Sequence, residues 1–132
     1  MKSYLPTCVA LISMFVANGV LAEDLPASAK KASMDEFKAF SNGKKVNVEI
    51  FDQKSPVKAV LVWDWDKKTI TGTAVIDGKK KIQVKNTMKV EGDKACAVYK
   101  TEKTCHTIYI DQNKFYEITD SGAVHAISTL TP

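Results

Sequence analysis

The stretch KIQVKNTMKV, residues 81–90, alternates polar and apolar side chains with a period of two. Lysine, glutamine and threonine occupy one set of alternate positions. The other set is mainly apolar: Ile82, Val84, Asn86, Met88 and Val90. Successive side chains of a β-strand point to opposite faces of the sheet. The pattern therefore predicts a strand with one face toward a core and the other toward solvent.

The loop before this strand decides how the strand pairs with the preceding one. A two-residue turn at residues 77–78 would place Ala74 opposite Lys81 and mix the two faces. A three-residue loop at residues 77–79 places Ala74 opposite Ile82 and keeps the faces apart. We predict the longer loop, because a slip of one residue moves every side chain to the other face, although Asp-Gly favours the shorter turn.

Similar period-two runs follow one another along the chain, separated by short stretches of turn residues. They lie at residues 44–51, 57–65, 69–76, 80–90, 94–100, 103–110, 114–119 and 123–130. Short links join antiparallel strands, whereas parallel pairs need long crossovers. We therefore predict a mainly β fold in which eight antiparallel strands form a meander, closed as a barrel or strongly curled, lipocalin-like in general shape.

One short helix is predicted before the strands, over residues 34–41. Ser33 followed by Glu36 is the pattern of a capping box, and Gly43 stands where a helix commonly ends. Three apolar side chains recur at helical spacing: Met34, Phe37 and Phe40.

The first 22 residues have the three parts of a secretory signal peptide. Lys2 gives a positive start, residues 9–17 form an apolar run, and residues 20–22 offer a cleavage site. A membrane anchor is the alternative, but residues 18–19, Asn-Gly, interrupt the run that a membrane span needs. We divide the chain into a signal peptide at residues 1–22, a flexible N-terminal arm at residues 23–32 and a single β domain at residues 33–132.

Cleavage would remove Cys8 and leave Cys96 and Cys105, an even pair in an oxidising compartment. A hairpin with its turn at residues 100–101 places these two cysteines directly opposite each other, so we predict a disulfide. Haem attachment is excluded because Glu102 stands where that motif needs a cysteine. Adjacent strand residues point to opposite faces, so Cys105 and His106 are poorly placed to share a metal ion.

The charge of the chain argues against a nucleic-acid reader. Its formal net charge is +4, and every basic residue is a lysine. Arginine is the residue favoured for bidentate contacts with phosphates and base edges. The lysines are also spread along the chain, as on an ordinary solvated surface.

The most unusual local sequence is Trp-Asp-Trp-Asp at residues 63–66. Trp63 and Trp65 share one face of a strand that ends just before a turn, so they should lie near a rim of the barrel. There they would either stack on a ligand or plug the barrel end. The pattern favours the plug, because large aromatic side chains are mostly buried.

The two histidines and one tyrosine complete the candidate ligand-binding set: Trp63, Trp65, His106, Tyr109 and His125. His106 alternates with two isoleucines, and His125 shares its face with Ile127, so both fit a core or rim better than a catalytic position. No nucleophile stands in a recognisable motif, and we assign no catalytic residue. The alternatives are a small secreted hydrolase that pairs His106 or His125 with Asp64 or Asp66, and a metal-handling protein that uses the histidines.

Short motifs spread over about residues 33–125 occur in a characteristic order. They are carried by Ser41, Gly43, Lys44, Trp63, Thr71-Gly72-Thr73, Cys96, Cys105, Tyr109, Asp120 and Gly122. This combination resembles a family of uncharacterised small secreted proteins of proteobacteria, from which the chain differs in its second tryptophan and its lack of arginine. The resemblance implies export and a small β fold, and it adds no site.

We therefore expect an exported, non-catalytic binding protein of the bacterial envelope, periplasmic or secreted and monomeric. Its partner would be a small ligand, a glycan or an envelope protein, bound at the barrel mouth or on the surface. We expect no cofactor, no metal, no nucleic acid and no stable membrane span after cleavage of the signal.

Overall fold

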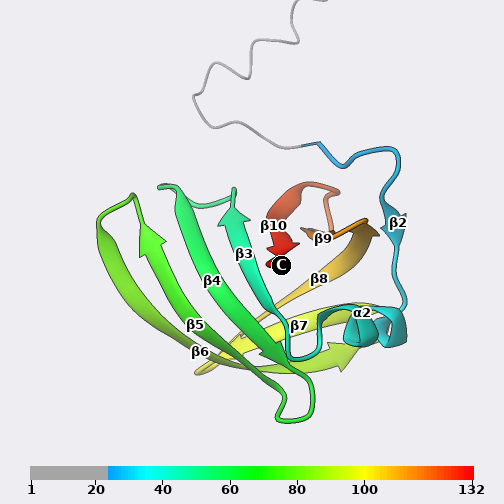
Figure 1. The fold of residues 1–132 in the computed structure, drawn as a ribbon, viewed down its shortest axis with the longest axis horizontal. Coiled ribbons are helices and arrows are strands. Elements are labelled where there is room, and N and C mark those ends of the chain that lie inside the picture. Colours follow the sequence, from blue (N-terminus) through cyan, green and yellow to red (C-terminus); the bar gives the residue numbers. More distant parts are fainter. Residues whose placement is uncertain (1–23) are drawn as a thin grey trace, which may run out of the picture.

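The computed structural model describes residues 24–132, so the predicted signal peptide and Cys8 lie outside the described residues. Strands make up most of this part of the chain, and one helix, α2 (Met34–Ser41), precedes the long strands (Figure 1). The strands are β2 (Lys30–Lys31), β3 (Lys45–Ile50), β4 (Val57–Asp64), β5 (Thr69–Ile76), β6 (Lys80–Glu91), β7 (Lys94–Tyr99), β8 (Glu102–Asp111), β9 (Lys114–Ile118) and β10 (Val124–Leu130). No helix within residues 24–132 is long and apolar enough to cross a membrane.

Antiparallel pairing closes the sheet on itself. The strand order is β2-β8-β7-β6-β5-β4-β3-β10-β9, and β8 also pairs with β9. Strands β3 to β10 therefore form a closed eight-stranded barrel, and β2 is one extra strand on the edge of β8. The expected fold, a short helix followed by eight antiparallel strands, is confirmed.

The hairpin between β5 and β6 has the predicted register. Ala74 pairs with Ile82, and residues 77–79 form the loop. Within this loop Asp77 and Gly78 both have positive φ, and the amide of Lys79 donates to the carbonyl of Ile76 at 3.0 Å. Two positive φ values are typical of the tight turn that Asp-Gly favours. The longer loop thus contains the favoured turn and still keeps the two faces apart.

The face of β6 that we expected in the core is buried only in part. Met88 is 3% exposed, but Ile82 and Val90 are 37% and 36% exposed. The reason is that β6 is 12 residues long, and neighbouring strands flank it on both sides only near its middle. Ile82 has a pairing partner in β5 alone, and Val90 has one in β7 alone.

Gly72 in β5 lies where the backbones of β4 and β5 approach closely. A Cβ atom at this position would lie 1.9 Å from the carbonyl oxygen of Val60 and 2.9 Å from the Cα atom of Leu61. Both neighbours are backbone atoms of β4, so neither moves aside easily. Only glycine fits here, and it lets the two strands approach this closely.

Helix α2 closes one end of the barrel, at the lower right in Figure 1. The predicted capping box is present, because the amide of Glu36 donates to Ser33 Oγ and the amide of Ser33 donates to Glu36 Oε1. Phe37 is fully buried and meets Trp63 and Phe115 edge-on, with ring centroids 5.2 and 4.8 Å apart. Aromatic rings from the helix and the barrel wall therefore fill this end of the core.

A second apolar cluster lies on the outside of the barrel, over β9 and β10. We call Tyr116, Ile118 and Val124 the outer cluster; Leu25 and Ala29 of the N-terminal arm pack against it. Tyr116 and Ile118 alternate with Phe115 of the inner core, which places them on the opposite face of β9.

The N-terminal arm, predicted as flexible over residues 23–32, is attached to the barrel at its end. Lys30 and Lys31 pair with β8, and the amide of Ala32 donates to the carbonyl of Ile108 at 2.9 Å. Lys31 also forms an ion pair with Asp93 in the turn before β7. A strand of two lysines shows no alternation of polar and apolar side chains, so the sequence pattern did not predict it. The β unit therefore begins a few residues earlier than the predicted boundary.

Candidate functional site

The five candidate ligand-binding residues occupy three separate places. Trp63 and Trp65 lie at the end of the barrel that α2 closes. His106 and His125 stack on each other beside the loop that follows β3. Tyr109 is half-buried on the outer face, against the outer cluster. The structure therefore does not gather the predicted residues into a single site.

Trp63 belongs to the core. Its side chain is 4% exposed, and its ring packs at steep angles against Phe37 and Phe115. Among the described residues, its indole Nε1 is buried without a hydrogen-bond partner. No face of this ring is open to a ligand, so its packing favours the interpretation of Trp63 as a plug.

Trp65 lies at the rim and is held in place by the end of α2. Its indole Nε1 donates to Ser41 Oγ at 2.9 Å, and its backbone amide donates to Asn42 Oδ1 at 2.8 Å. The Ser41 hydroxyl in turn donates to the carbonyl of Phe37 at 2.7 Å. These bonds fix the orientation of a half-buried indole before any ligand arrives.

Trp65 lines a cavity of about 830 Å³ between α2, the turn after β4, and β6. The volume alone falls within the range typical of small-molecule sites, about 300–1,000 Å³, but the hollow is open, since most of its lining residues are exposed. The lining residues are Lys38, Ala39, Asn42, Trp65, Asp66, Lys68, Met88, Lys89 and Val90. We call this the Trp65 cavity.

The Trp65 cavity is predominantly positive. Three lysines line it against one aspartate, Asp66. The ammonium group of Lys38 lies over the Trp65 ring, 5.5 Å from its centroid. Within residues 24–132, Lys38 and Lys68 form no ion pair, whereas Lys89 lies 3.6 Å from Glu91.

The two histidines form a stacked pair with a carboxylate at each side. Their ring centroids are 4.3 Å apart, and their planes differ by 11°. His125 Nδ1 lies 2.6 Å from Asp52 Oδ1, and His106 Nδ1 lies 3.6 Å from Glu117 Oε1. The shorter distance is a hydrogen bond, and the longer one becomes an ion pair only when His106 is protonated.

A register shift in β10 explains how the two rings meet. The pairing of β10 with β9 moves by one residue between Val124 and Ala126, so His125 is the extra residue of a bulge. The sequence placed His125 on the face of Ile127, and this expectation is wrong. Ile127 packs with the outer cluster, whereas His125 stacks on His106.

The carboxylates beside the histidines are not the ones that the hydrolase hypothesis named. Asp64 accepts a hydrogen bond from the amide of Lys67 in the turn after β4, and Asp66 lines the Trp65 cavity. Within the described part of the chain, no hydroxyl or thiol group hydrogen bonds to either histidine ring. The pair is thus a candidate proton acceptor without a partner nucleophile.

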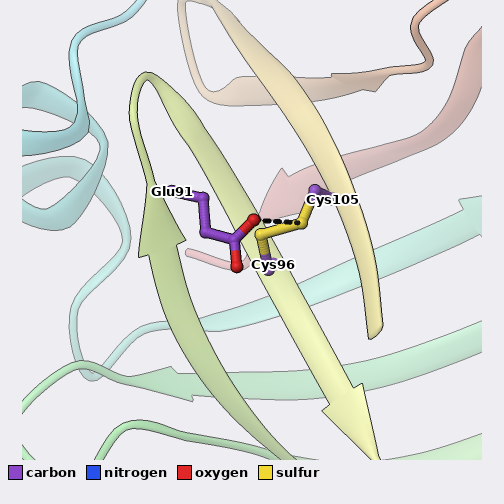
Figure 2. A group of neighbouring side chains, drawn as sticks. All are labelled: Glu91, Cys96 and Cys105. Atoms are coloured by element: carbon purple, nitrogen blue, oxygen red, sulfur yellow. Dashed lines mark hydrogen bonds between the residues drawn. A yellow bond between two sulfur atoms is a disulfide. The ribbon is translucent and has the colours of Figure 1, made fainter. Parts of the chain in front are cut away.

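The stacking also prevents the histidines from sharing a metal ion. A metal lies in the plane of each imidazole that ligates it, about 2.0–2.1 Å from the nitrogen. The two histidine rings are nearly parallel and 4.3 Å apart. No single position therefore lies in the plane of both rings and at that distance from a nitrogen of each. Among residues 24–132, one group of three potential ligands comes close together: Glu91, Cys96 and Cys105 (Figure 2).

The group in Figure 2 is a disulfide beside a carboxylate. Cys96 and Cys105 are directly paired across β7 and β8, with Cα atoms 4.0 Å apart, and their sulfur atoms are bonded, as predicted. Cys105 Sγ lies 3.9 Å from Glu91 Oε1, but a disulfide sulfur has no proton to donate and no thiolate charge for a metal. Lys103 hydrogen bonds to Glu91 and lowers the pKa of its carboxyl.

A larger groove, about 1,020 Å³, lies on the outer surface of β3, β4 and β10 and continues under the loop after β3. Its wall includes Phe51, Val60 and Ile127, with Lys54 and Lys58 at its side. Val60 is among the most exposed aliphatic side chains of the described chain. Sequence reasoning missed this groove, because residues of several strands and of the loop after β3, far apart in sequence, line it together.

No family model, curated protein or solved structure matches the chain. The resemblance to small secreted proteins of proteobacteria therefore stays a prediction. The function has to be argued from the chemistry of the chain's own residues.

Proposed function

We propose that this protein is an exported, non-catalytic binding protein of the bacterial envelope, and that it binds a small ring-shaped ligand on the indole of Trp65. The observation that carries the proposal is the fixed, half-buried Trp65 ring in the wall of an 830 Å³ cavity. An aromatic face of this kind offers a large contact area to a sugar or another flat ring.

Preorganisation supports this use of Trp65. A ligand that orders a loose side chain loses binding free energy, about 0.5–1.5 kcal/mol for each immobilised side chain. Here α2 has already ordered the indole through Ser41 and Asn42. A closed barrel behind the cavity adds a rigid support.

Export is supported by the disulfide and by the predicted signal peptide. Disulfides persist in oxidising compartments and are rare in the cytosol. The cross-link between Cys96 and Cys105 is therefore compatible with a periplasmic or secreted location. Expression of the full chain in a bacterium with a periplasm, followed by fractionation and N-terminal sequencing, tests this part. We expect a periplasmic or secreted product that begins at Glu23, and an intact cytoplasmic chain would contradict export.

Ligand binding is tested by fluorescence in a variant with one reporter. The chain has two tryptophans, so Trp63→Phe leaves Trp65 as the sole indole. This protein is titrated with neutral sugars, acidic sugars and small aromatic compounds. We expect at least one class to change the Trp65 emission to saturation, and calorimetry on the unsubstituted protein to give the same affinity. If no ring compound does either, the Trp65 cavity is not a binding site.

Trp65→Phe and Trp65→Ala are the matched variants. Phenylalanine keeps a smaller aromatic face, so we expect it to weaken binding less than alanine does. Circular dichroism and thermal unfolding of both variants confirm that the barrel is intact. A variant that folds normally and binds as tightly as the unsubstituted protein would place the ligand elsewhere.

A small secreted hydrolase is the second candidate, and the 2.6 Å contact between His125 and Asp52 is the observation that favours it. A carboxylate that orients a histidine is part of many hydrolytic sites. Esterase, peptidase and glycosidase substrates test it with His125→Gln and His106→Gln as controls. Turnover that both substitutions abolish would establish the enzyme and remove the non-catalytic proposal.

A further inference from the structure

We infer that the ligand of the Trp65 cavity is an acidic saccharide, whose ring packs on Trp65 and whose carboxylate is bound by the surrounding lysines. This inference rests on the proposed function, because it names the ligand class of the same cavity. It adds a charge requirement that the indole alone does not impose.

The positive charge of the cavity is largely unneutralised by the protein itself. Lys38 and Lys68 form no ion pair within the described chain, and the Lys38 ammonium is instead placed over the Trp65 ring. The Lys89 ammonium lies 3.6 Å from Glu91 Oε2, the same oxygen that Lys103 contacts, so Lys89 already has a carboxylate partner. An anion that enters the cavity therefore meets two lysines, Lys38 and Lys68, that form no ion pair within the described chain.

Lys38 takes part in both interactions proposed for the ligand, ring stacking on Trp65 and ion pairing with a carboxylate. Its ammonium group lines the cavity and also lies 5.5 Å from the centroid of the Trp65 ring. A carboxylate on a sugar draws this ammonium toward itself, which exposes the indole face to the sugar ring. Ring stacking and ion pairing are thus available to one ligand that carries both groups on a compact frame.

Apolar side chains complete the cavity. Met88 and Val90 of β6 line it, and Val90 is 36% exposed although it lies on the inner face of the barrel. The C–H face of a sugar ring is weakly apolar and suits such a surface, whereas a bare inorganic anion leaves it in contact with water. The combination favours an acidic saccharide over phosphate or sulfate alone.

Nucleic acid has related chemistry, since single strands also combine stacking with phosphate contacts. Such sites use a groove that follows the backbone and several successive aromatic platforms. Here one indole lies at the rim, the second, Trp63, is buried, and the chain contains no arginine. A saccharide with one ring in the cavity requires only what Trp65 and its lysines provide.

The test uses acidic oligosaccharides and their uncharged esters. The Trp63→Phe protein is titrated with oligogalacturonate and hyaluronan oligosaccharides, and in parallel with the methyl esters of the same lengths. Sodium phosphate and a short oligonucleotide are the other two arms. We expect the acids to bind more tightly than the esters by about tenfold, and their affinity to fall as sodium chloride rises, since salt screens exposed charges.

Lysine variants localise the effect. We expect Lys38→Gln, Lys68→Gln and Lys89→Gln each to weaken acid binding by about two- to fivefold, the size of an exposed ion pair. Lys68→Gln and Lys89→Gln should leave ester binding unchanged, whereas Lys38→Gln also changes the surface over the Trp65 ring. Asp66→Asn removes the one carboxylate of the wall and should tighten acid binding by a similar factor. Lys81→Gln, on the same strand as Lys89 but away from the cavity, is the matched control and should have no effect.

The outcomes separate this inference from the proposed function. If acids and esters bind equally, the charge requirement is wrong while Trp65 remains a binding site. If phosphate or the oligonucleotide binds more tightly than every acidic saccharide, the ligand class is wrong. If the whole panel leaves both the Trp65 emission and the calorimetric heat unchanged, this inference fails, and the titrations with neutral sugars and aromatic compounds decide whether the proposed function fails with it.

Discussion

Trp65 and Ser41 are joined by a hydrogen bond of 2.9 Å from the indole Nε1 to the hydroxyl oxygen, which ties the wall of the cavity to the last turn of α2. Ser41 is fully buried, and its own proton goes to the carbonyl of Phe37. One hydroxyl group therefore serves the helix and the rim together.

Replacement of Ser41 by alanine should loosen both the last turn of α2 and the Trp65 side chain. The indole N–H of Trp65 loses its acceptor in a partly buried position, and we expect the free energy of unfolding to fall by about 1–3 kcal/mol. Urea unfolding measures this change, and in the Trp63→Phe background a red shift of the emission reports a wetter Trp65. Ser55→Ala, in the loop after β3, is the control. An unchanged emission maximum would show that packing alone holds the ring.

Trp63 should tolerate phenylalanine but not alanine. Its Nε1 is a buried donor without a partner in the described chain, so Trp63→Phe removes an unsatisfied group together with some packing area. We expect a loss below about 1.5 kcal/mol for phenylalanine. Trp63→Ala leaves a cavity beside Phe37 and Phe115 and should cost about 3–5 kcal/mol. Equal costs for the two substitutions in thermal unfolding would contradict this account.

The disulfide should contribute a moderate share of stability. It closes a short loop, with a sequence separation of 9 between Cys96 and Cys105, and the chain-entropy model gives about 2–3 kcal/mol for a loop of this size. The Cys96→Ala/Cys105→Ala variant should unfold at a lower urea concentration by that amount, with the barrel retained. Addition of reductant should move the unsubstituted protein toward the variant and leave the variant unchanged.

The attachment of the N-terminal arm should weaken slightly in acid. The hydrogen bond from Lys31 lowers the pKa of Asp93 from its ordinary value of 3.8. A carboxyl whose pKa is lower in the folded state stabilises that state above the ordinary pKa, and this contribution is lost as pH falls through the lowered pKa. The pairing of Lys30 and Lys31 with β8 should therefore weaken at the acidic end, and also at high salt because both partners are exposed.

The amide resonance of Ala32 reports this weakening, since its proton is hydrogen-bonded to the carbonyl of Ile108. A titration by NMR from about pH 6 to pH 2 should move this resonance with a midpoint below the ordinary carboxyl pKa. Asp93→Asn should abolish that transition and leave the resonance near its acidic position at every pH. A transition that persists in Asp93→Asn would assign the effect to another group.

Most of the barrel could be predicted from the sequence, because short stretches of turn residues join consecutive strands and some strands, such as residues 80–90, alternate polar and apolar side chains. The strand predicted over residues 80–90 ends within one residue of its observed limit. The pairing of Cys96 with Cys105 follows once a two-residue turn is placed at residues 100–101. Such features depend on neighbours in the chain. Local chemistry is sufficient to specify them.

The features that were missed depend on residues far apart in sequence. The partner of His125 is Asp52, 73 residues away, and a bulge reverses the side to which His125 points. Strand β2 has only two lysines, and its pairing is specified by the end of β8 that extends beyond the pairing with β7. Neither period nor spacing contains this information. The Trp65 cavity falls between these cases, since the rim position of Trp65 was predicted but the lysines of α2 and β6 that surround it were not.

The strand order also has a consequence for how the chain folds. From β3 to β10 each strand pairs with the next one along the chain, and one pairing, between β3 and β10, joins residues as far apart as Val46 and Leu130. Hairpins can form one after another with little loss of chain entropy, but this last seam closes a long loop and should limit the folding rate. We expect substitutions in the pairing of β3 with β10, such as Val48→Ala, to slow folding in stopped-flow experiments more than they accelerate unfolding, as for contacts already made in the transition state.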